Sequence, residues 1–213
     1  MQIDVWSDYA CPWCALGTAR LEVALRDFEH GDAVTVAHRA FELDPRAPAA
    51  SAVSSDEAVS RKYGMSPEQV RAGHAQITAL GAEVGFTFDF DRVRLGNTFD
   101  AHRLTQAARG TAWEAPLVRR LFIARFSEGR QLSDHQVLRD IADSVGLPAP
   151  FTDEVFDGPA YSEEVRADEA AATELGVTGV PYFLIGGAWP VPGAQDVQTL
   201  GVVLERAWSR VSH

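Results

Sequence analysis

Apolar and polar positions in the first forty residues follow the pattern of a strand, a helix and a second strand. Residues 2–7 alternate apolar and polar side chains, which is typical of a half-buried strand. A helix is predicted to open at Cys11 and Pro12, because proline suits the first turn, and to end near Gly31. Residues 34–43 predict a second strand. The helix would then be a crossover between two parallel strands.

After the second strand, helical patterns replace strand patterns. Residues 47–55 have the composition of a linker, and residues 56–145 are predicted to be mostly helical. Capping patterns predict two helix starts, one at Ser66–Gln69 and one at Ser133–Gln136. The further predicted elements are helices at 98–109 and 114–128 and an extended segment at 86–96.

The last part of the chain returns to an α/β pattern. A polar, alanine-rich helix is predicted to end near Leu175. The apolar run at 182–185 predicts a strand, and the two glycines after it predict a turn into a partner strand at 189–191. A last helix is expected at 196–209. The two ends of the chain can then form one sheet, with the helical middle as an insertion between them.

Composition and charge exclude several classes of protein. The 213 residues are 46% hydrophobic and 23% charged, which is enough to bury a sizeable core. Nineteen basic and thirty acidic residues give a formal charge of −11, which is unsuited to nucleic-acid backbones and anionic membranes. No apolar run approaches the roughly eighteen residues of a membrane span. The N-terminus lacks the basic and apolar regions of a secretion signal, so we expect a cytoplasmic protein.

The two cysteines, Cys11 and Cys14, lie in the first turn of the first predicted helix. A single disulfide between two such close cysteines cannot stabilise a secreted, disulfide-dependent chain of this length. Backbone N–H groups and the helix dipole favour a thiolate there, and the pKa of a cysteine can fall from about 8.5 to roughly 3.5–7.5. The pattern predicts Cys11 as a nucleophile towards disulfides and Cys14 as the resolving thiol. The intervening Pro12 and Trp13 are expected to tune the redox poise.

Two other interpretations of the cysteine pair stay open. Half of a structural zinc site would need two further Cys or His ligands. There is no third cysteine and the histidines are not paired at ligand spacing, so no metal is expected. The cysteines could also be inert core residues. The six histidines are His30, His38, His74, His102, His135 and His213.

A second chemical signal is Val180-Pro181, directly before the predicted strand at 182–185. Proline cannot donate to a strand ladder, so it belongs at a strand start or edge. A cis bond at Pro181 would bring this loop against the dithiol and leave the backbone of Val180 free to pair with an extended peptide. The alternative is an ordinary trans proline in a turn.

Together these residues resemble the thioredoxin superfamily. The resemblance rests on the Cys11–Cys14 motif after a strand and on the run Gly179–Phe183 much later. The long helical insertion between them is similar to that of DsbA-like proteins. Further matches are Asp8, Asn97, Thr98, Ala101–Leu104 and Gly193–Gln195. These matches resemble the FrnE subgroup of the DsbA-like oxidoreductases.

The resemblance implies an α/β thioredoxin fold with a large inserted all-helical domain. Residues 1–45 and 158–213 would form a discontinuous thioredoxin-like domain, and residues 46–157 the inserted domain. The implied activity is thiol–disulfide exchange or disulfide isomerisation, with Val180 and a cis Pro181 positioning the substrate. The missing export signal argues against oxidative folding of secreted proteins and favours reduction, isomerisation or a response to oxidative stress.

The expected partners follow from that chemistry. The substrate would be a disulfide in a protein or a small molecule, and the electron donor would be glutathione or a thioredoxin system. No cofactor is expected beyond the redox-active disulfide of Cys11 and Cys14. Neither a nucleic acid nor a membrane is an expected partner. The chain is expected to be a monomer or a homodimer.

Two other functions are compatible with the same sequence. The inserted-helix architecture is also similar to kappa-class glutathione transferases and 2-hydroxychromene-2-carboxylate isomerases, which suggests a glutathione-dependent transferase or isomerase. Those relatives typically lack a resolving cysteine, whereas this chain has Cys14. A non-catalytic, chaperone-like module that binds peptides near the dithiol is the third alternative.

Several further residues have two interpretations each. Asn97 and Thr98 could border the dithiol and contact substrate, or form a turn and helix N-cap. His102 could tune the charge of Cys11 or be a structural polar residue. Trp13 could be exposed beside the thiol or packed. Phe86, Phe88, Phe90 and Phe99 could line a groove or the core, and Gln195 could approach the active-site loop or cap the last helix.

Overall fold

The computed structural model describes residues 1–211, and its first elements are those that the sequence predicts. Strand β1 (Gln2–Ser7) is followed by helix α1 (Pro12–Asp27), a short 3-10 helix η1 (Gly31–Ala33) and strand β2 (Thr35–Ala40). β1 and β2 pair in parallel, with Gln2 opposite Thr35. The crossover between parallel strands is therefore confirmed.

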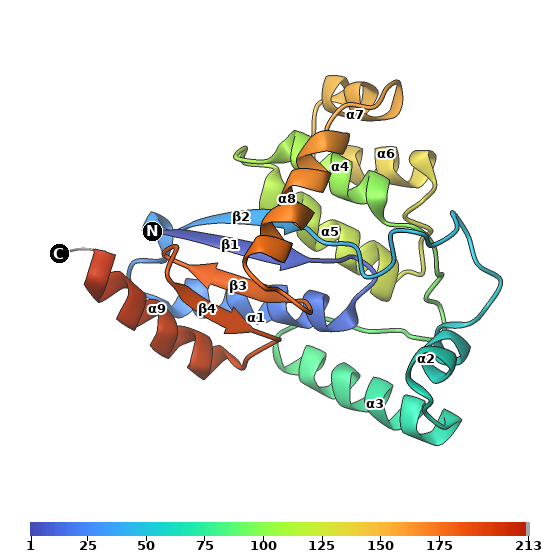
Figure 1. Cartoon of the computed structure of the whole chain (residues 1–213), viewed down its shortest axis with the longest axis horizontal. Helices are drawn as coiled ribbons and strands as arrows, with labels where there is room; N and C mark the ends of the chain where they lie inside the picture. The colour runs from blue at the N-terminus through green and yellow to red at the C-terminus, as the bar shows by residue number, and fades with distance from the viewer. Residues whose placement is uncertain (212–213) are drawn as a thin grey trace.

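The described residues form one four-stranded sheet in the order β2-β1-β3-β4 (Figure 1). The two later strands, β3 (Tyr182–Ile185) and β4 (Trp189–Pro192), form the predicted hairpin. Gly186 and Gly187 in its turn have φ of 60° and 69°, a region that glycine enters without steric cost. β3 also pairs antiparallel with β1, so the two ends of the chain do meet in one sheet.

The outer edge of β2 is closed by side chains. The backbone N–H of His38 donates to Glu114 (2.7 Å), and that of Ala40 donates to Asp168 (2.9 Å). Both carboxylates are buried. Two of the N–H groups that an edge strand would otherwise leave unpaired are thereby satisfied within the chain.

The other edge of the sheet is β4, which carries two prolines. Pro190 lies opposite Leu184, and Pro192 lies opposite Tyr182. Proline has no backbone N–H, and within sheets it is confined largely to edge strands, strand starts and bulges. The two prolines of β4 are therefore compatible with an edge strand, which pairs with a neighbour on one side only.

Helices cover both faces of the sheet. α1 and α9 (Val197–Val211) pack on one face, where Ile3 and Phe183 meet Leu200 in a buried apolar cluster. α8 (Ser162–Glu174) crosses the other face (Figure 1) and is fixed there by the Trp6 indole N–H, which donates to the Asp168 carbonyl at 2.9 Å. This is an α/β arrangement with helices on both sides of a mixed sheet.

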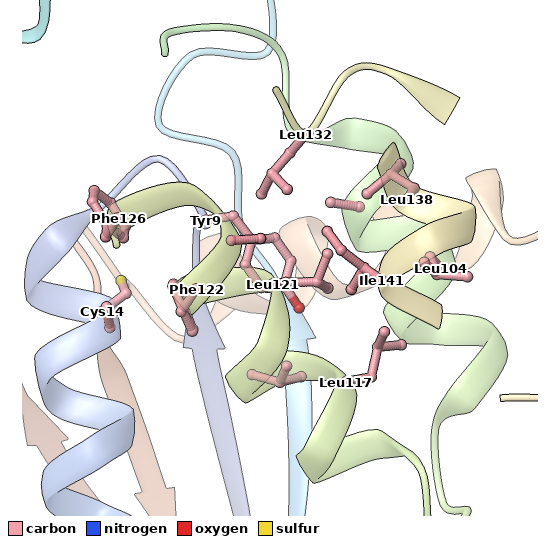
Figure 2. Packing of buried hydrophobic residues seen from close by; sticks show 14 of the residues in the cluster. Tyr9, Cys14, Leu104, Leu117, Leu121, Phe122, Phe126, Leu132, Leu138 and Ile141 are labelled. Carbon is pink, nitrogen blue, oxygen red and sulfur yellow. The ribbon is translucent and has the colours of Figure 1, made fainter. Parts of the chain in front are cut away.

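The helical insertion between β2 and α8 supplies the largest core. Its helices are α2 (Ser55–Tyr63), α3 (Pro67–Glu83), α4 (Phe99–Ala108), α5 (Glu114–Phe126), α6 (His135–Ser144) and α7 (Ala149–Phe156). In Figure 1, α4 to α7 gather beside the sheet, whereas α2 and α3 extend away from them. Figure 2 shows that the core of the insertion reaches Tyr9 and Cys14. The dithiol and the inserted helices therefore share one apolar cluster.

The capping predictions for the inserted helices have different outcomes. Ser66 and Gln69 form the predicted box, with each backbone N–H donating to the other side chain. The second prediction is wrong by one residue, because Asp134 is the N-cap of α6 and accepts from the Gln136 N–H at 2.8 Å. Ser133 instead donates to the carbonyl of Ala49.

The insertion also contains an extended segment and the short helix α7. The segment 86–96 contains neither helix nor strand, in line with the extended chain expected there, and α7 was not predicted as a separate helix. No helix within the described part of the chain combines the length and hydropathy needed to cross a bilayer. The domain boundaries at residues 46 and 157 stay predictions.

Candidate active site

The dithiol lies where β1 ends and α1 begins. The chain turns through Asp8 after β1, and the Cys11 N–H donates to the Asp8 carbonyl at 3.0 Å. Cys11 is the N-cap of α1 with extended φ and ψ (−101°, 114°), and Pro12 follows in the first turn. Cys14 lies one turn further along. This geometry points the first N–H groups of α1 and the positive end of its dipole at Cys11.

The two thiols differ in accessibility. Both cysteines are free thiols, and Cys14 is fully buried whereas Cys11 keeps 6% of its surface exposed. Figure 2 shows Cys14 on α1 beside Phe122 and Phe126 of the inserted helix α5. Trp13, between the cysteines, is 39% exposed, so it is the exposed member of the motif. Both thiols are therefore buried, and Cys11 is the more accessible of the two.

The two thiols also differ in their proton affinity. The pKa of Cys11 lies below its ordinary value, first because the Cys14 thiol hydrogen-bonds to its sulfur and also because backbone N–H groups of the helix start point at it; burial opposes this. The pKa of Cys14 lies well above its ordinary value, first because of burial and then because its proton is shared with Cys11. At neutral pH, Cys11 is therefore the stronger nucleophile of the pair.

The loop before β3 lies over the start of α1. The peptide bond between Val180 and Pro181 is cis, as the resemblance implies. The Cys11 sulfur lies 3.7 Å from the carbonyl oxygen of Val180, within reach of an S–H hydrogen bond. A methyl group at Gly17 would lie 2.9 Å from Cγ of Pro181. Residues 169 positions apart in the sequence thus meet at the dithiol.

Thr98 and His102 turn towards the carboxylate of Asp8, and Asn97 turns towards the start of α4. Thr98 donates to Oδ1 of Asp8 at 2.8 Å, and Nε2 of His102 lies 3.5 Å from the same oxygen. The Asn97 side chain accepts from the Phe99 N–H at 2.8 Å, as a side chain at a helix start does. Thr98 and His102 are buried, so the structure supports their structural interpretation over direct contact with substrate.

The other candidate residues have separate positions. Phe86 and Phe88 are buried in the core of the insertion, and Phe90 packs against that core. The Gln195 side chain donates to the Pro192 carbonyl at 2.7 Å, and Asp196 rather than Gln195 accepts from the first turn of α9. His213 lies outside the described residues. Among residues 1–211, no group of three or more His, Cys, Asp or Glu side chains could hold a metal ion.

Two buried charges of the structure, Asp8 and Arg125, have no role that the sequence alone indicates. Asp8, which matches a family pattern, is 1% exposed and accepts several hydrogen bonds. Arg125 of α5 is also 1% exposed, and it is not part of any sequence motif. The position of Asp8, three residues before Cys11, could have drawn attention to it. Nothing in the local sequence marks Arg125.

The sheet order and the inserted helices define a thioredoxin-like α/β protein that is mostly helical. Residues 2–205 match the DSBA-like thioredoxin domain, and the chain belongs to this family, whose members are disulfide oxidoreductases or isomerases. The predicted family and fold class are thereby confirmed.

Solved structures show the same fold. A probable DsbA oxidoreductase from Streptomyces coelicolor is 39% identical, with a TM-score of 0.91 over 98% of this chain and 90% of that one. A 2-hydroxychromene-2-carboxylate isomerase is 17% identical, with a TM-score of 0.72 over 100% and 98% of the two chains. The cytosolic disulfide reductase DsbM from Pseudomonas aeruginosa, solved with GSH, is 18% identical, with a TM-score of 0.63 over 100% and 98%. The last two likenesses concern the fold alone.

Proposed function

We propose that the protein is a thiol–disulfide oxidoreductase that uses Cys11 as nucleophile and Cys14 as resolving thiol. The observation that supports this most is the difference between the two thiols. Cys11 keeps a small exposed area and has a lowered pKa, whereas Cys14 has no exposed area and a raised pKa. An attacking thiol needs access and thiolate character, and a resolving thiol needs only proximity to the first.

The reaction balances in two exchanges. The Cys11 thiolate attacks one sulfur of a substrate disulfide, that S–S bond breaks, and the departing thiolate takes a proton. Cys14 then gives up its proton and attacks the Cys11 sulfur, and the second substrate thiolate leaves and is protonated. The substrate gains two electrons, and the Cys11–Cys14 pair becomes a disulfide. An external thiol, glutathione or a thioredoxin-type donor, returns it to the dithiol.

The loop at Val180 would hold the substrate during this exchange. The Val180 carbonyl, 3.7 Å from the Cys11 sulfur, lies beside the point of attack. Trp13 offers an exposed indole next to it, which suits apolar contact with a substrate segment. Pro12 lies in the first turn of α1. Proline has no backbone N–H, but at this position its absence removes no hydrogen bond of the helix, and the other N–H groups that face Cys11 remain.

Cysteine variants test the proposal in an insulin-reduction assay. Cys11→Ser is expected to reduce the rate to the uncatalysed background, because no thiolate remains to attack. Cys14→Ser is expected to accumulate a mixed disulfide that intact mass spectrometry detects, because the resolving thiol is gone. Wild-type protein alkylated in the dithiol state is the matched control and should also be inactive. Full activity of Cys11→Ser would end the proposal.

A glutathione-dependent isomerase or transferase is the second candidate, motivated by the likeness in fold to the 2-hydroxychromene-2-carboxylate isomerase. It predicts tight glutathione binding and isomerase turnover that survive Cys14→Ala. Loss of turnover in that variant would favour disulfide exchange. The FrnE subgroup and the cytoplasmic location stay predictions, and cell fractionation checks the latter.

A further inference from the structure

Asp8 is a buried carboxylate between the dithiol and the inserted helices. It is 1% exposed, and both of its oxygens accept hydrogen bonds. The donors are the N–H of Ala10 (3.0 Å), the N–H of Leu43 (2.7 Å) and the hydroxyl of Thr98 (2.8 Å). Burial raises the pKa of Asp8, but the contact with His102 and these hydrogen bonds outweigh it and lower the pKa. Asp8 is therefore a fixed negative charge at neutral pH.

The inserted helices bring a histidine against this carboxylate and place a buried guanidinium in its surroundings. Nε2 of His102, on α4, lies 3.5 Å from Oδ1 of Asp8. Arg125, on α5, is 1% exposed, and its Nε and Nη1 have no hydrogen-bond partner within residues 1–211. Burial lowers the pKa of Arg125, and the charge of Asp8 opposes that effect. A buried guanidinium without hydrogen bonds acts on its surroundings through its charge.

The same carboxylate acts on both thiols. Its negative charge raises the pKa of Cys14, in addition to the larger effects of burial and of Cys11, and it opposes the lowering of the pKa of Cys11. The Cys11 N–H also donates to the backbone carbonyl of Asp8. The titratable groups around Asp8 are Cys11 and Cys14 at α1, Tyr9 beside it, His102 on α4 and Arg125 on α5, with Glu42 beyond His102.

We propose that Asp8 is a positioning residue through which the inserted helices set the redox balance of the dithiol. The inference rests on the proposed exchange at Cys11. The charge of Asp8 disfavours the Cys11 thiolate and hence the reduced state, whereas Arg125 offsets that charge and favours the reduced state. Thr98 holds the carboxylate in place. The insertion would then act on the reaction from beneath the dithiol, without contacting the substrate.

Two substitutions of opposite sign test the inference. Asp8→Asn is expected to shift the equilibrium with glutathione about tenfold towards the dithiol, which corresponds to about 30 mV for a two-electron couple. Arg125→Met is expected to shift it towards the disulfide, because the charge of Asp8 is then no longer offset. Equilibration at defined glutathione ratios, alkylation of free thiols and intact mass give the constant for each variant.

A second readout is the pH dependence of Cys11 alkylation. Its midpoint should fall in Asp8→Asn and rise in Arg125→Met relative to wild type, whereas a merely structural defect would not move the two in opposite directions. Thr98→Val removes one donor to Asp8 without changing charge, and it should alter the midpoint less than Asp8→Asn. If Asp8→Asn fails to fold, Arg125→Met and Thr98→Val decide the question.

The matched control is Asp168→Asn. Asp168 is likewise buried and accepts from Ala40 (2.9 Å) and Gln106 (2.6 Å), but it lies at the outer edge of β2. This variant should lower the urea midpoint of unfolding without moving the redox equilibrium. The inference is overturned if the wild-type dithiol is oxidised and reduced reversibly by glutathione, but the redox equilibria of Asp8→Asn and Arg125→Met shift in the same direction or not at all. If wild type forms no disulfide, the proposed function fails, and the alkylation profile still decides the role of Asp8.

Discussion

Arg125 is the residue whose burial is hardest to reconcile with stability alone. Its guanidinium is 1% exposed and two of its nitrogens lack hydrogen-bond partners within the described chain. Buried donors left unsatisfied cost about 1–3 kcal/mol. Arg125→Met removes these unsatisfied donors but also removes the charge that offsets Asp8. We therefore expect it to lower the free energy of unfolding less than the loss of a fully paired arginine does, measured by urea denaturation at pH 7.

Arg109 is the matched control at the residue scale. Its guanidinium is also partly buried, but it donates to the His38 carbonyl at 2.7 Å and pairs with Asp168. Arg109→Met removes these partners and leaves the Asp168 carboxylate less compensated, so it is expected to lower the free energy of unfolding. The same substitution should thus cost more stability at Arg109 than at Arg125, and an equal loss at the two sites would contradict this expectation.

Some residues of the candidate site can be predicted from the sequence, and others cannot. The positions of Cys11 and Cys14 follow from a local rule, because a helix start presents its N–H groups to the first cysteine. Asp8 and Arg125 are separated by more than a hundred residues, and only the packing of α5 against the β1–α1 turn brings their charges together. A single sequence has no local signal for such a pairing.

At the scale of elements, the contact between α1 and the loop before β3 depends on Gly17. A Cβ there would lie 2.9 Å from Cγ of Pro181 and 3.2 Å from the Phe183 ring. We expect Gly17→Ala to lower stability by about 1–3 kcal/mol, as overpacking does, and to slow insulin reduction because the loop is displaced from Cys11. Urea denaturation and the reduction assay measure the two effects.

Gly73→Ala is the control for that substitution. Gly73 is also inside a helix, α3, but a Cβ there meets no atom within 4 Å in the described chain. Alanine should then stabilise the helix by about 0.5–1 kcal/mol and leave insulin reduction unchanged. Equal effects of the two substitutions would contradict the role given to the close approach at Gly17.

Element prediction succeeded where local patterns decide and failed where tertiary contacts compete. Hairpin, crossover and capping signals placed the strands and α3 correctly. At α6, Ser133 and Asp134 are both good caps, and the loop at Ala49 engages Ser133, which leaves Asp134 as the N-cap. Such competition between adjacent caps is settled by a partner distant in sequence.

At the scale of the whole molecule, Glu114 links the insertion to the sheet. It is 4% exposed and accepts from the N–H groups of His38 and Gly110, both at 2.7 Å. Burial alone would raise the pKa of Glu114, but its hydrogen bond with the His38 imidazole and these two backbone hydrogen bonds lower it. Since the folded pKa lies below the unfolded one, about 4.3, the stabilisation is complete above that pH and is lost as pH falls through the folded pKa.

We therefore expect the stability difference between wild type and Glu114→Gln to shrink as the pH falls from 6 to 3. Urea midpoints at several pH values measure it. Glu22→Gln is the control, because burial raises the pKa of Glu22 and its contribution has the opposite pH dependence. If the stability difference between wild type and Glu114→Gln were the same at every pH, this would contradict the lowered pKa of Glu114.

The two closed edges of the sheet have a consequence for the protein at high concentration. The N–H groups of His38 and Ala40 in β2 are taken by Glu114 and Asp168, and β4 carries Pro190 and Pro192. An incoming strand from a second copy would find few donors to pair with on either side. The sheet is thus limited to its own strands, and the folded protein is guarded against fibril growth by strand addition, even though its β1–β3 core is rich in strand-forming residues.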